Sequence, residues 1–236
     1  MGELDLRLEA SAAAEFAANT GNDAGFQLPA VQWDLSSRRI MTMAWADGLP
    51  LGDNAALDEA GHDRAVLGER VLQLFLNHAL RDGYFHADMH QGNLKVAANG
   101  DIIAYDFGIM GHIDEYTRRV YAEILYGFIR RDYRRVAEVH FEAGYIPPDQ
   151  DVEAFAQALR AVGEPIFGMD ASRISMGRLL HYLFEVTEWF GMQTRTELIH
   201  LQRTMVVVEG VSRSLNPQIN IWDIAHPVVE DYIKTS

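Results

Sequence analysis

Hydrophobic positions recur at helical spacing over most of the chain. The clearest stripe lies in residues 63–81, where Val66, Val71 and Leu74 fall on one face and Gly83 follows. Apolar residues three or four positions apart predict an amphipathic helix, and a glycine just beyond the last of them favours its end. The same spacing predicts further helices, at residues 4–19, 114–131, 133–143, 151–162, 175–190, 194–214 and 222–233.

Alternating and short continuous apolar runs predict four strands. Residues 26–35 and 39–45 form one pair, with a turn at residues 36–37 between them. Residues 94–97 and 102–105 form another, and an Asn-Gly turn at residues 99–100 separates them. An Asn-Gly pair between two apolar runs is a strong signal for a two-residue hairpin. The predicted fold class is α+β and mostly helical, with a small sheet.

Composition narrows the class of protein further. With 236 residues, 48% of them hydrophobic, the chain can bury a substantial core in one or two domains. It contains no cysteine, which excludes disulfides and thiolate metal sites. A net charge of −14 argues against nucleic acid as a partner, and it means that local cations or a metal must attract any polyphosphate.

Targeting and membrane signals are absent from the sequence as it stands. The first residues are charged, unlike a secretory signal peptide, and no apolar run reaches the length that spans a bilayer. The most apolar stretch late in the chain, residues 205–208, is ended by Glu209. We therefore expect a cytoplasmic protein with no transmembrane segment in this chain.

Three polar residues have the spacing of a kinase active site. Asn93 follows Asp88 by five residues, and Asp106 follows it by eighteen and begins an Asp-Phe-Gly motif (residues 106–108). Catalytic loops of the protein-kinase-like fold and their metal-binding Asp-Phe-Gly have this spacing. The predicted hairpin at residues 94–105 lies between them and should bring all three side chains to one end of a small sheet.

The residue types suit magnesium and phosphate chemistry. Magnesium prefers oxygen ligands, so we expect Asp106 to supply a carboxylate and Asn93 a neutral amide oxygen. Asp88 and His86 are the predicted catalytic residues of the loop. Asp88 would orient the acceptor or take its proton, whereas His86 would pack and hydrogen-bond behind Asp106. His90 is expected to cap the loop. The alternative is a surface hairpin that carries Asp, Asn and Gly because loops favour them.

Six segments carry a resemblance that runs through essentially the whole chain. They are residues 3–10 with their Glu-x-Asp element, 28–31, 41–48, 86–93, 106–108 and 220–222. In these segments the chain resembles the UbiB/aarF family of atypical kinase-like proteins. The resemblance implies a protein-kinase-like fold that binds ATP with Mg²⁺, supports ubiquinone (polyprenyl quinone) biosynthesis, and acts as an ATPase or a lipid-directed small-molecule kinase. Only residues 109–113 separate the Asp-Phe-Gly motif from the next helix cap, which leaves no room for a long peptide-binding segment.

The resemblance also implies nucleotide contacts, at Glu3, Asp5, Glu9, Met43, Ala44 and Ala46. Glu3 and Asp5 would be the family's Glu-x-Asp pair near the phosphates, and Glu9 the helix glutamate that pairs with a strand lysine. The backbone of residues 43–46 would meet adenine. From the residues alone, the three carboxylates also fit a solvated acidic face at a helix N-terminus, and the strand fits ordinary core.

The sequence departs from the family pattern at several places. The Lys-x-Gly-Gln helix, the nucleotide loop and the strand lysine should precede Glu3 and are not in this sequence, nor are the C-terminal hydrophobic helices that anchor many members. Ala44 stands where the family commonly has an acidic residue, and Met89 and Gln91 where it has proline. We therefore expect residues 1–48 to be a remnant of the N-lobe (a helix, two strands and the hinge), and residues 49–236 to be the helical C-lobe with the catalytic loop.

Three functions of different classes remain open from the sequence. The first is the UbiB-type ATP-dependent enzyme, with a polyprenyl lipid or quinone-biosynthesis proteins as partners and with peripheral association at the inner face of the cell membrane. The second is a small-molecule phosphotransferase of the aminoglycoside or choline kinase type, which shares His-x-Asp-x-His-x-x-Asn. The third is a non-catalytic module that binds a lipid or a partner protein.

Overall fold

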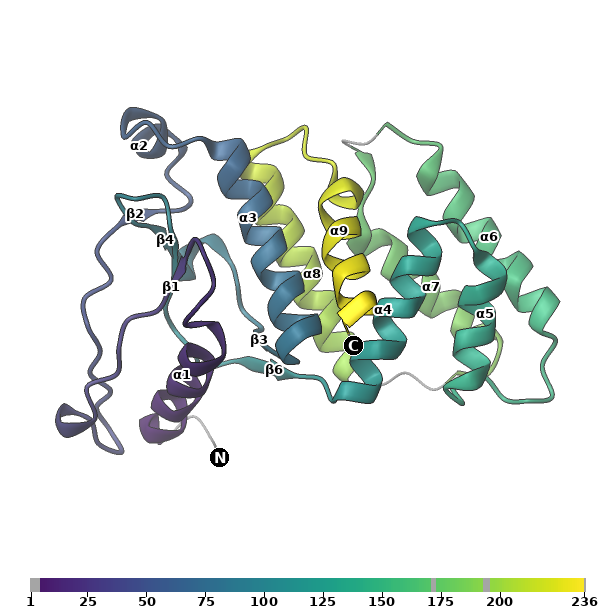
Figure 1. The fold of residues 1–236 in the computed structure, drawn as a ribbon, viewed down its shortest axis with the longest axis horizontal. Coiled ribbons are helices and arrows are strands. Elements are labelled where there is room, and N and C mark those ends of the chain that lie inside the picture. Colours follow the sequence, from purple (N-terminus) through teal and green to yellow (C-terminus); the bar gives the residue numbers. More distant parts are fainter. Residues whose placement is uncertain (1–4, 171–172, 193–195, 236) are drawn as a thin grey trace.

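The computed structural model describes residues 5–170, 173–192 and 196–235, and it is mostly helical (Figure 1). The helices are α1 (Leu6–Thr20), α2 (Asn54–Glu59), α3 (Arg64–Asn77), α4 (Glu115–Ile129), α5 (Tyr133–Glu142), α6 (Val152–Phe167), α7 (Met176–Trp189), α8 (Thr196–Leu215) and α9 (Ile221–Thr235). The strands are β1 (Phe26–Gln27), β2 (Leu49–Pro50), β3 (Tyr84–His86), β4 (Leu94–Val96), β5 (Ile102–Ala104) and β6 (Met110–His112). Every helix predicted from the sequence is present, whereas the short helix α2 was not predicted.

Side-chain caps explain where the helices begin. The residue before each of α1 to α7 accepts a hydrogen bond from a backbone N–H of the first turn. The caps are Asp5, Asp53, Asp63, Asp114, Asp132, Asp151 and Ser175. Each such cap stabilises a helix by about 1 kcal/mol. The long stripe at residues 63–81 continues beyond α3 as one π-helical turn, His78–Asp82, which ends at the left-handed Gly83.

A four-stranded sheet has the order β1-β5-β4-β2. Strands β4 and β5 form the predicted antiparallel hairpin, with Leu94 opposite Ala104, and β1 joins β5 in parallel. A second, two-stranded sheet pairs β3 with β6. Strand β3 leads into the catalytic loop and β4 follows it. Strand β5 precedes the Asp-Phe-Gly motif and β6 follows it.

The predicted strand pair at residues 26–35 and 39–45 is wrong in its extent. Only Phe26–Gln27 is a strand, and Trp33–Leu35 is a 3₁₀ turn. The two segments meet at single bridges, such as the one between Val31 and Met43. Local turn chemistry replaces the ladder, because the Ser36 hydroxyl donates to a backbone carbonyl at residue 32 (2.8 Å) and accepts from the backbone N–H at residue 42 (3.0 Å).

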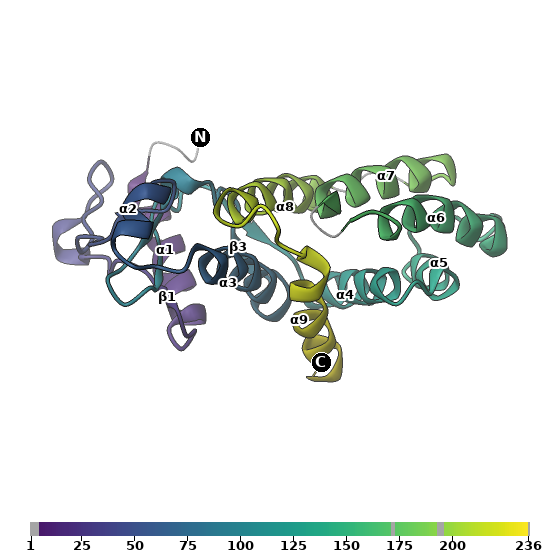
Figure 2. The ribbon, with the colours of Figure 1, turned by 90° about the horizontal axis from the view of Figure 1, so that it is seen from above.

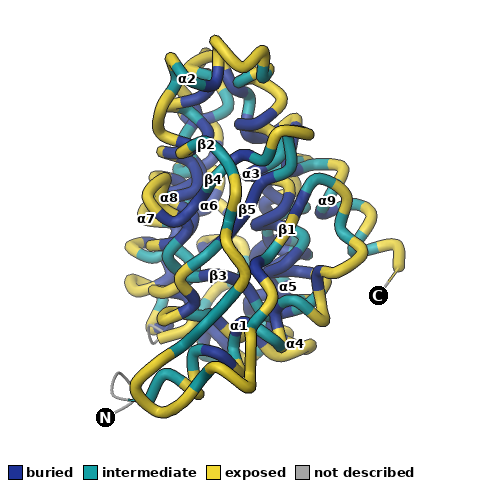
Figure 3. Tube along the Cα trace, turned by 90° about the vertical axis from the view of Figure 1, so that its left-hand side faces the viewer, coloured by how far each residue is buried: buried dark blue, intermediate teal, exposed yellow. Residues whose placement is uncertain are grey.

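Helices α3, α8 and α9 lie side by side at the centre of the molecule, and α4 to α7 extend away from α1 and the sheet (Figures 1 and 2). One hydrophobic core continues from the end that holds α1 into the helices that extend away from it. It runs from Phe16 of α1 through Phe75 of α3 to Phe155 of α6. In contrast, none of residues 30–50 is buried, and this loop lies outermost at the sheet end (Figure 3). Within the described ranges, no helix combines the length and apolar character needed to cross a bilayer.

Candidate active site

The catalytic loop (residues 86–93) brings Asp88 and Asn93 together. It ends in a 3₁₀ turn, Gln91–Asn93, that His90 caps by accepting from the Gly92 N–H at 3.0 Å. This turn carries Asn93 back to Asp88, where its Nδ2 donates to the Asp88 carbonyl (3.1 Å) and to its carboxylate (3.4 Å). Asn93 is buried, whereas the Asp88 side chain is 40% exposed.

His86 lies in the interior directly behind this loop. Its Nδ1 accepts from the Asp88 backbone N–H at 3.0 Å, and its ring lies 5.7 Å from that of Phe107. Burial lowers the pKa of His86, although backbone groups of Asp106 and Tyr105 and the charges of both aspartates oppose this. His86 therefore holds the Asp88 backbone through Nδ1 and packs beside Phe107, the residue after Asp106.

The Asp-Phe-Gly motif begins with strained backbone. Asp106 has a φ of 68°, in the left-handed region, and its Oδ1 accepts from the Gly108 N–H at 3.2 Å. The preceding Tyr105 ties the motif to the catalytic loop, because its backbone N–H donates to the Asn93 carbonyl (3.1 Å) and its hydroxyl to the Gly92 carbonyl (2.6 Å). The hairpin and these two bonds thus fix Tyr105, the residue before Asp106, against the end of the catalytic loop.

Helix α1 supplies a carboxylate to the same motif. The Glu9 Oε1 accepts from the Phe107 backbone N–H at 3.1 Å, across 98 positions of sequence. Between α1 and the motif lies an open pocket of about 440 Å³, which Asp5, Glu9, Phe107 and Gly108 line in part. Glu9 therefore contacts the backbone of the Asp-Phe-Gly motif.

Asp5 has a different environment from the one that the family resemblance implies. It caps α1, and its carboxylate binds the Arg7 guanidinium at 2.6 and 2.9 Å. The hydrogen bond from Arg7 lowers the pKa of Asp5 to about 2. The carboxylate is thus already paired with a cation. Glu3 lies outside the described residues.

The hinge residues lie along the exposed loop that precedes β2. Met43 forms the bridge with Val31, the Ala44 N–H donates to the Ala30 carbonyl (2.8 Å), and the Ala46 carbonyl accepts from Lys95 Nζ (3.0 Å). Sequence reasoning missed Lys95. It is one of only two lysines in the chain and interrupts the apolar strand β4, which was the available signal.

Lys95 joins the hinge to Tyr105, the residue before the Asp-Phe-Gly motif. Its ammonium lies 4.8 Å from the Trp45 ring centroid and 5.6 Å from that of Tyr105. A cation over aromatic faces is held by the ring quadrupoles. In a chain with a net charge of −14, this side chain places a positive charge beside the candidate nucleotide site.

The donor atoms at the site fit a hard divalent cation. Asp88 and Asp106 offer carboxylates, and the Asn93 amide nitrogen is used by Asp88, so its amide oxygen is the atom that can bind a metal. Magnesium takes oxygen ligands and is usually held by one or two carboxylates together with substrate phosphates. These features, together with a helix glutamate on the Asp-Phe-Gly backbone, define a protein-kinase-like site.

Comparison with known proteins also indicates a kinase-like protein. Residues 1–140 match the ABC1 atypical kinase-like domain, and residues 159–220 match the UbiB helical domain. The chain belongs to the ABC1 family of atypical kinase-like proteins. The family resemblance found in the sequence is thereby confirmed.

Curated relatives are similar over nearly all of this chain. A probable protein kinase UbiB of Cronobacter sakazakii is 40% identical over 238 aligned positions, which cover 99% of this chain and 44% of that protein. The protein of the same name from Marinobacter nauticus is 38% identical over 236 positions, which cover 98% of this chain and 43% of that protein. The chain therefore spans less than half the length of these relatives.

A solved structure shares the fold. The complex of Rv3197 with erythromycin from Mycobacterium tuberculosis matches with a TM-score of 0.63 at 20% identity, over 98% of this chain and 59% of that one. This similarity confirms the mostly helical, protein-kinase-like fold.

Proposed function

We propose that this chain carries the catalytic loop and the metal-binding motif of a UbiB-type atypical kinase or ATPase that uses ATP and Mg²⁺. The observation that carries the proposal is the bonding of Asn93 to Asp88, with the residue before Asp106 fixed against the end of the same loop. The UbiB name of the relatives supports a role in ubiquinone biosynthesis. A polyprenyl lipid or quinone-biosynthesis proteins, met in the cytoplasm or at the inner face of the cell membrane, are the partners that fit this role.

Each residue has a part in the proposed reaction. Asp106 and Asn93 would hold Mg²⁺, which when bound would neutralise charge on the phosphates. Asp88, partly exposed and oriented by Asn93, would align the hydroxyl or water that attacks and accept its proton. His86 would keep the two aspartates in register from behind. The backbone of Met43, Ala44 and Ala46 would meet adenine, with Asp5 and Glu3 towards the phosphates.

The segment after the motif favours a small acceptor over a peptide. Residues after Gly108 run at once into β6, Met110–His112, which pairs with β3, and α4 follows at Glu115. Protein kinases dock peptides on a longer segment between Asp-Phe-Gly and the next helix. Since this connection is short and already paired in a sheet, a small molecule or water is the acceptor that the geometry supports.

Calorimetric titration of the 236-residue chain with ATP tests the proposal. Carboxylates dominate the site, and phosphates are normally held by a lysine and backbone amides, so we expect weak binding that requires Mg²⁺. Asp106→Asn should abolish the Mg²⁺-dependent heat. The matched control is Asp149→Asn, which removes the same charge from an exposed loop and should leave binding unchanged. Equal binding with and without Mg²⁺, or an unaffected Asp106→Asn variant, would contradict the proposal.

A further inference from the structure

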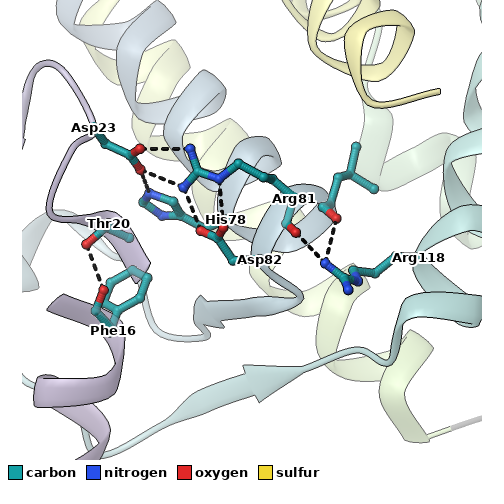
Figure 4. A network of polar contacts seen from close by, with 8 residues as sticks. Phe16, Thr20, Asp23, His78, Arg81, Asp82 and Arg118 are labelled. Carbon is teal, nitrogen blue, oxygen red and sulfur yellow. Dashed lines mark hydrogen bonds and ion pairs between the residues drawn. The ribbon is translucent and has the colours of Figure 1, made fainter. Parts of the chain in front are cut away.

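The loop after α1 is fastened to the helical part of the molecule through one carboxylate (Figure 4). Asp23 lies three residues beyond α1 and donates its backbone N–H to the Thr20 carbonyl at 2.9 Å. Its Oδ1 accepts from Arg81 Nη1 at 2.7 Å, and its Oδ2 accepts from Arg81 Nη2 at 2.9 Å and lies 3.0 Å from His78 Nε2. The carboxylate is only 13% exposed. We call Asp23, His78 and Arg81 the Asp23 clamp.

The negative charge of this cluster is partly compensated within the protein. Burial lowers the pKa of His78 to about 4, so at neutral pH the ring is uncharged and its Nε2–H donates to Asp23. The guanidinium of Arg81 also binds Asp82, at 2.6 and 2.7 Å, and therefore lies between two carboxylates. Asp23, His78 and Asp82 present ligand atoms within 4.8 Å of one another, and the Arg81 guanidinium already bonds both of these carboxylates.

The π-helical turn presents both clamp residues to the loop. His78 and Arg81 are three positions apart within His78–Asp82, directly after α3. Such turns widen the helix and leave backbone groups to be satisfied elsewhere. Arg118 of α4 meets this need by donating to the carbonyls of Leu80 and Arg81. The clamp thus rests on a turn that α4 supports from the other side.

Helix α1 connects the clamp to the active site. Phe16, fully buried in the middle of α1, places its ring 5.0 Å from His78 and 6.2 Å from Phe107. Near its other end, α1 presents Glu9 to the Phe107 backbone N–H at 3.1 Å. The helix is therefore held at its C-terminal end by the clamp, in its middle by Phe16, and near its start by the Asp-Phe-Gly motif.

We propose that Asp23 is a positioning residue. It fixes the C-terminal end of α1 to the π-helical turn after α3 and so holds Glu9 on the backbone of the Asp-Phe-Gly motif. The Glu9 bond is a single contact beside an open pocket and cannot fix a fifteen-residue helix by itself. A bidentate guanidinium–carboxylate pair with a third hydrogen bond is strong and directional by comparison. Loss of the clamp frees one end of α1 and lets the other end move away from Phe107.

Amide hydrogen exchange of the 236-residue chain, followed residue by residue by NMR, tests this inference without nucleotide. In Asp23→Asn, the Phe107 amide should exchange roughly tenfold faster or more, while core amides of α8 keep their rates, because local opening and global unfolding are separable by exchange. Glu9→Ala should accelerate the same amide. Asp82→Asn is the matched control, since it removes the other carboxylate of Arg81 and has no bond to the loop after α1.

Two results would overturn the inference. One is an unchanged Phe107 amide in Asp23→Asn, and the other is an equal acceleration at Phe107 and throughout α8, which marks a loss of global stability alone. If Asp23→Asn does not fold, Arg81→Lys decides, because it keeps the charge but loses the bidentate geometry. Arg81→Lys should also accelerate exchange at Phe107 selectively, and failure to do so would contradict a positioning role.

Discussion

Asp106 has a backbone conformation that most residues avoid. Its φ of 68° costs a residue with a side chain roughly 1–2 kcal/mol. Asp and Asn tolerate this region best because a short polar side chain can bond the nearby backbone, as Asp106 does with the Gly108 N–H. The residue type at position 106 therefore serves both the backbone turn and the proposed metal.

Two substitutions at this position should separate those roles. Asp106→Asn keeps a side chain suited to the turn, so its free energy of unfolding should stay within about 0.5 kcal/mol of the parent. Asp106→Ala loses the local bond and should be less stable by about 1–2 kcal/mol. Urea denaturation measures both values. Equal losses in the two variants would show that the side chain does not stabilise the turn.

Gly111 allows β6 to pass closely over the core. It lies opposite Phe85 in the β3–β6 pair, and a Cβ at this position would come within 2.2–2.7 Å of the Phe85 ring. Gly111→Ala should therefore lower the free energy of unfolding by about 1–3 kcal/mol, as overpacking does in other cores. Thermal or urea unfolding reports the loss. Gly210→Ala is the control. Position 210 is an exposed position of α8, and a Cβ there has open space around it, so this substitution should raise stability by up to ~1 kcal/mol.

At the scale of secondary structure, the sequence predicted best where the signals were local. The β4–β5 hairpin follows from its Asn-Gly turn and its alternation, and Asp residues at the caps mark helix starts. The prediction failed for residues 28–48, because strand formation there depends on pairing partners that an apolar run does not reveal. The π-helical turn at His78–Asp82 carries no distinct pattern, since its residues continue the stripe of α3.

The candidate site shows the same division. Motif spacing and the hairpin predict that Asp88, Asn93 and Asp106 lie together; in the structure Asn93 bonds Asp88, and the β4–β5 hairpin leads from Asn93 towards Asp106. The contact of Glu9 with Phe107 joins distant segments and was not predicted, because the family resemblance implied a strand lysine as the partner of Glu9. Lys95 was not predicted as a site residue, because a lone lysine in a strand is usually a solvated side chain.

Helix α7 is anchored at its N-terminus by a buried carboxylate of α8. Glu209 is only 6% exposed and accepts from the Gly177 N–H and the Ser175 hydroxyl, each at 3.1 Å, and from Arg213 at 3.2 Å. Glu209→Ala removes the acceptor of the Gly177 N–H and the Ser175 hydroxyl and the carboxylate partner of the Arg213 guanidinium, which we expect to cost about 3–5 kcal/mol. Urea denaturation monitored by circular dichroism measures it.

The control for this anchor is an acidic residue of α7 itself. Glu188→Ala removes an exposed carboxylate near the end of that helix and should change stability by no more than about 0.5 kcal/mol. A similar small effect for Glu209→Ala would mean that α7 docks through its apolar face alone.

At the scale of the whole molecule, burial lowers the pKa of three histidines in the described part of the chain, His78, His86 and His140. Burial lowers the pKa of His78 to about 4, against hydrogen bonding and charge from Asp23, and it lowers the pKa of His140 to about 4 as well. Their unfolded-state value is about 6.5. Between these two values the unfolded chain binds protons at both residues that the folded chain does not bind.

This difference in proton uptake fixes the sign of the pH dependence. Stability contributed by uncharged burial is fully present above about pH 6.5 and is lost as the pH falls towards 4. Burial alone would raise the pKa of Asp23, but the hydrogen bonds from Arg81 and His78 and the charge of Arg81 lower it, and this adds to the loss of stability at the acid end. Net repulsion among carboxylates acts in the opposite direction, because protonation relieves it as the pH falls.

We expect the histidines to dominate between pH 6.5 and 5, where few carboxylates have yet taken up protons. The midpoint of urea denaturation should therefore fall steadily over this range. His140→Phe should make that fall shallower, because the ring stays in the same aromatic contacts with Tyr145 and Phe155 but no longer titrates. His140 lies away from the Asp23 clamp, so this variant tests burial alone. A slope that is unchanged in His140→Phe would show that other groups control the acid sensitivity of this fold.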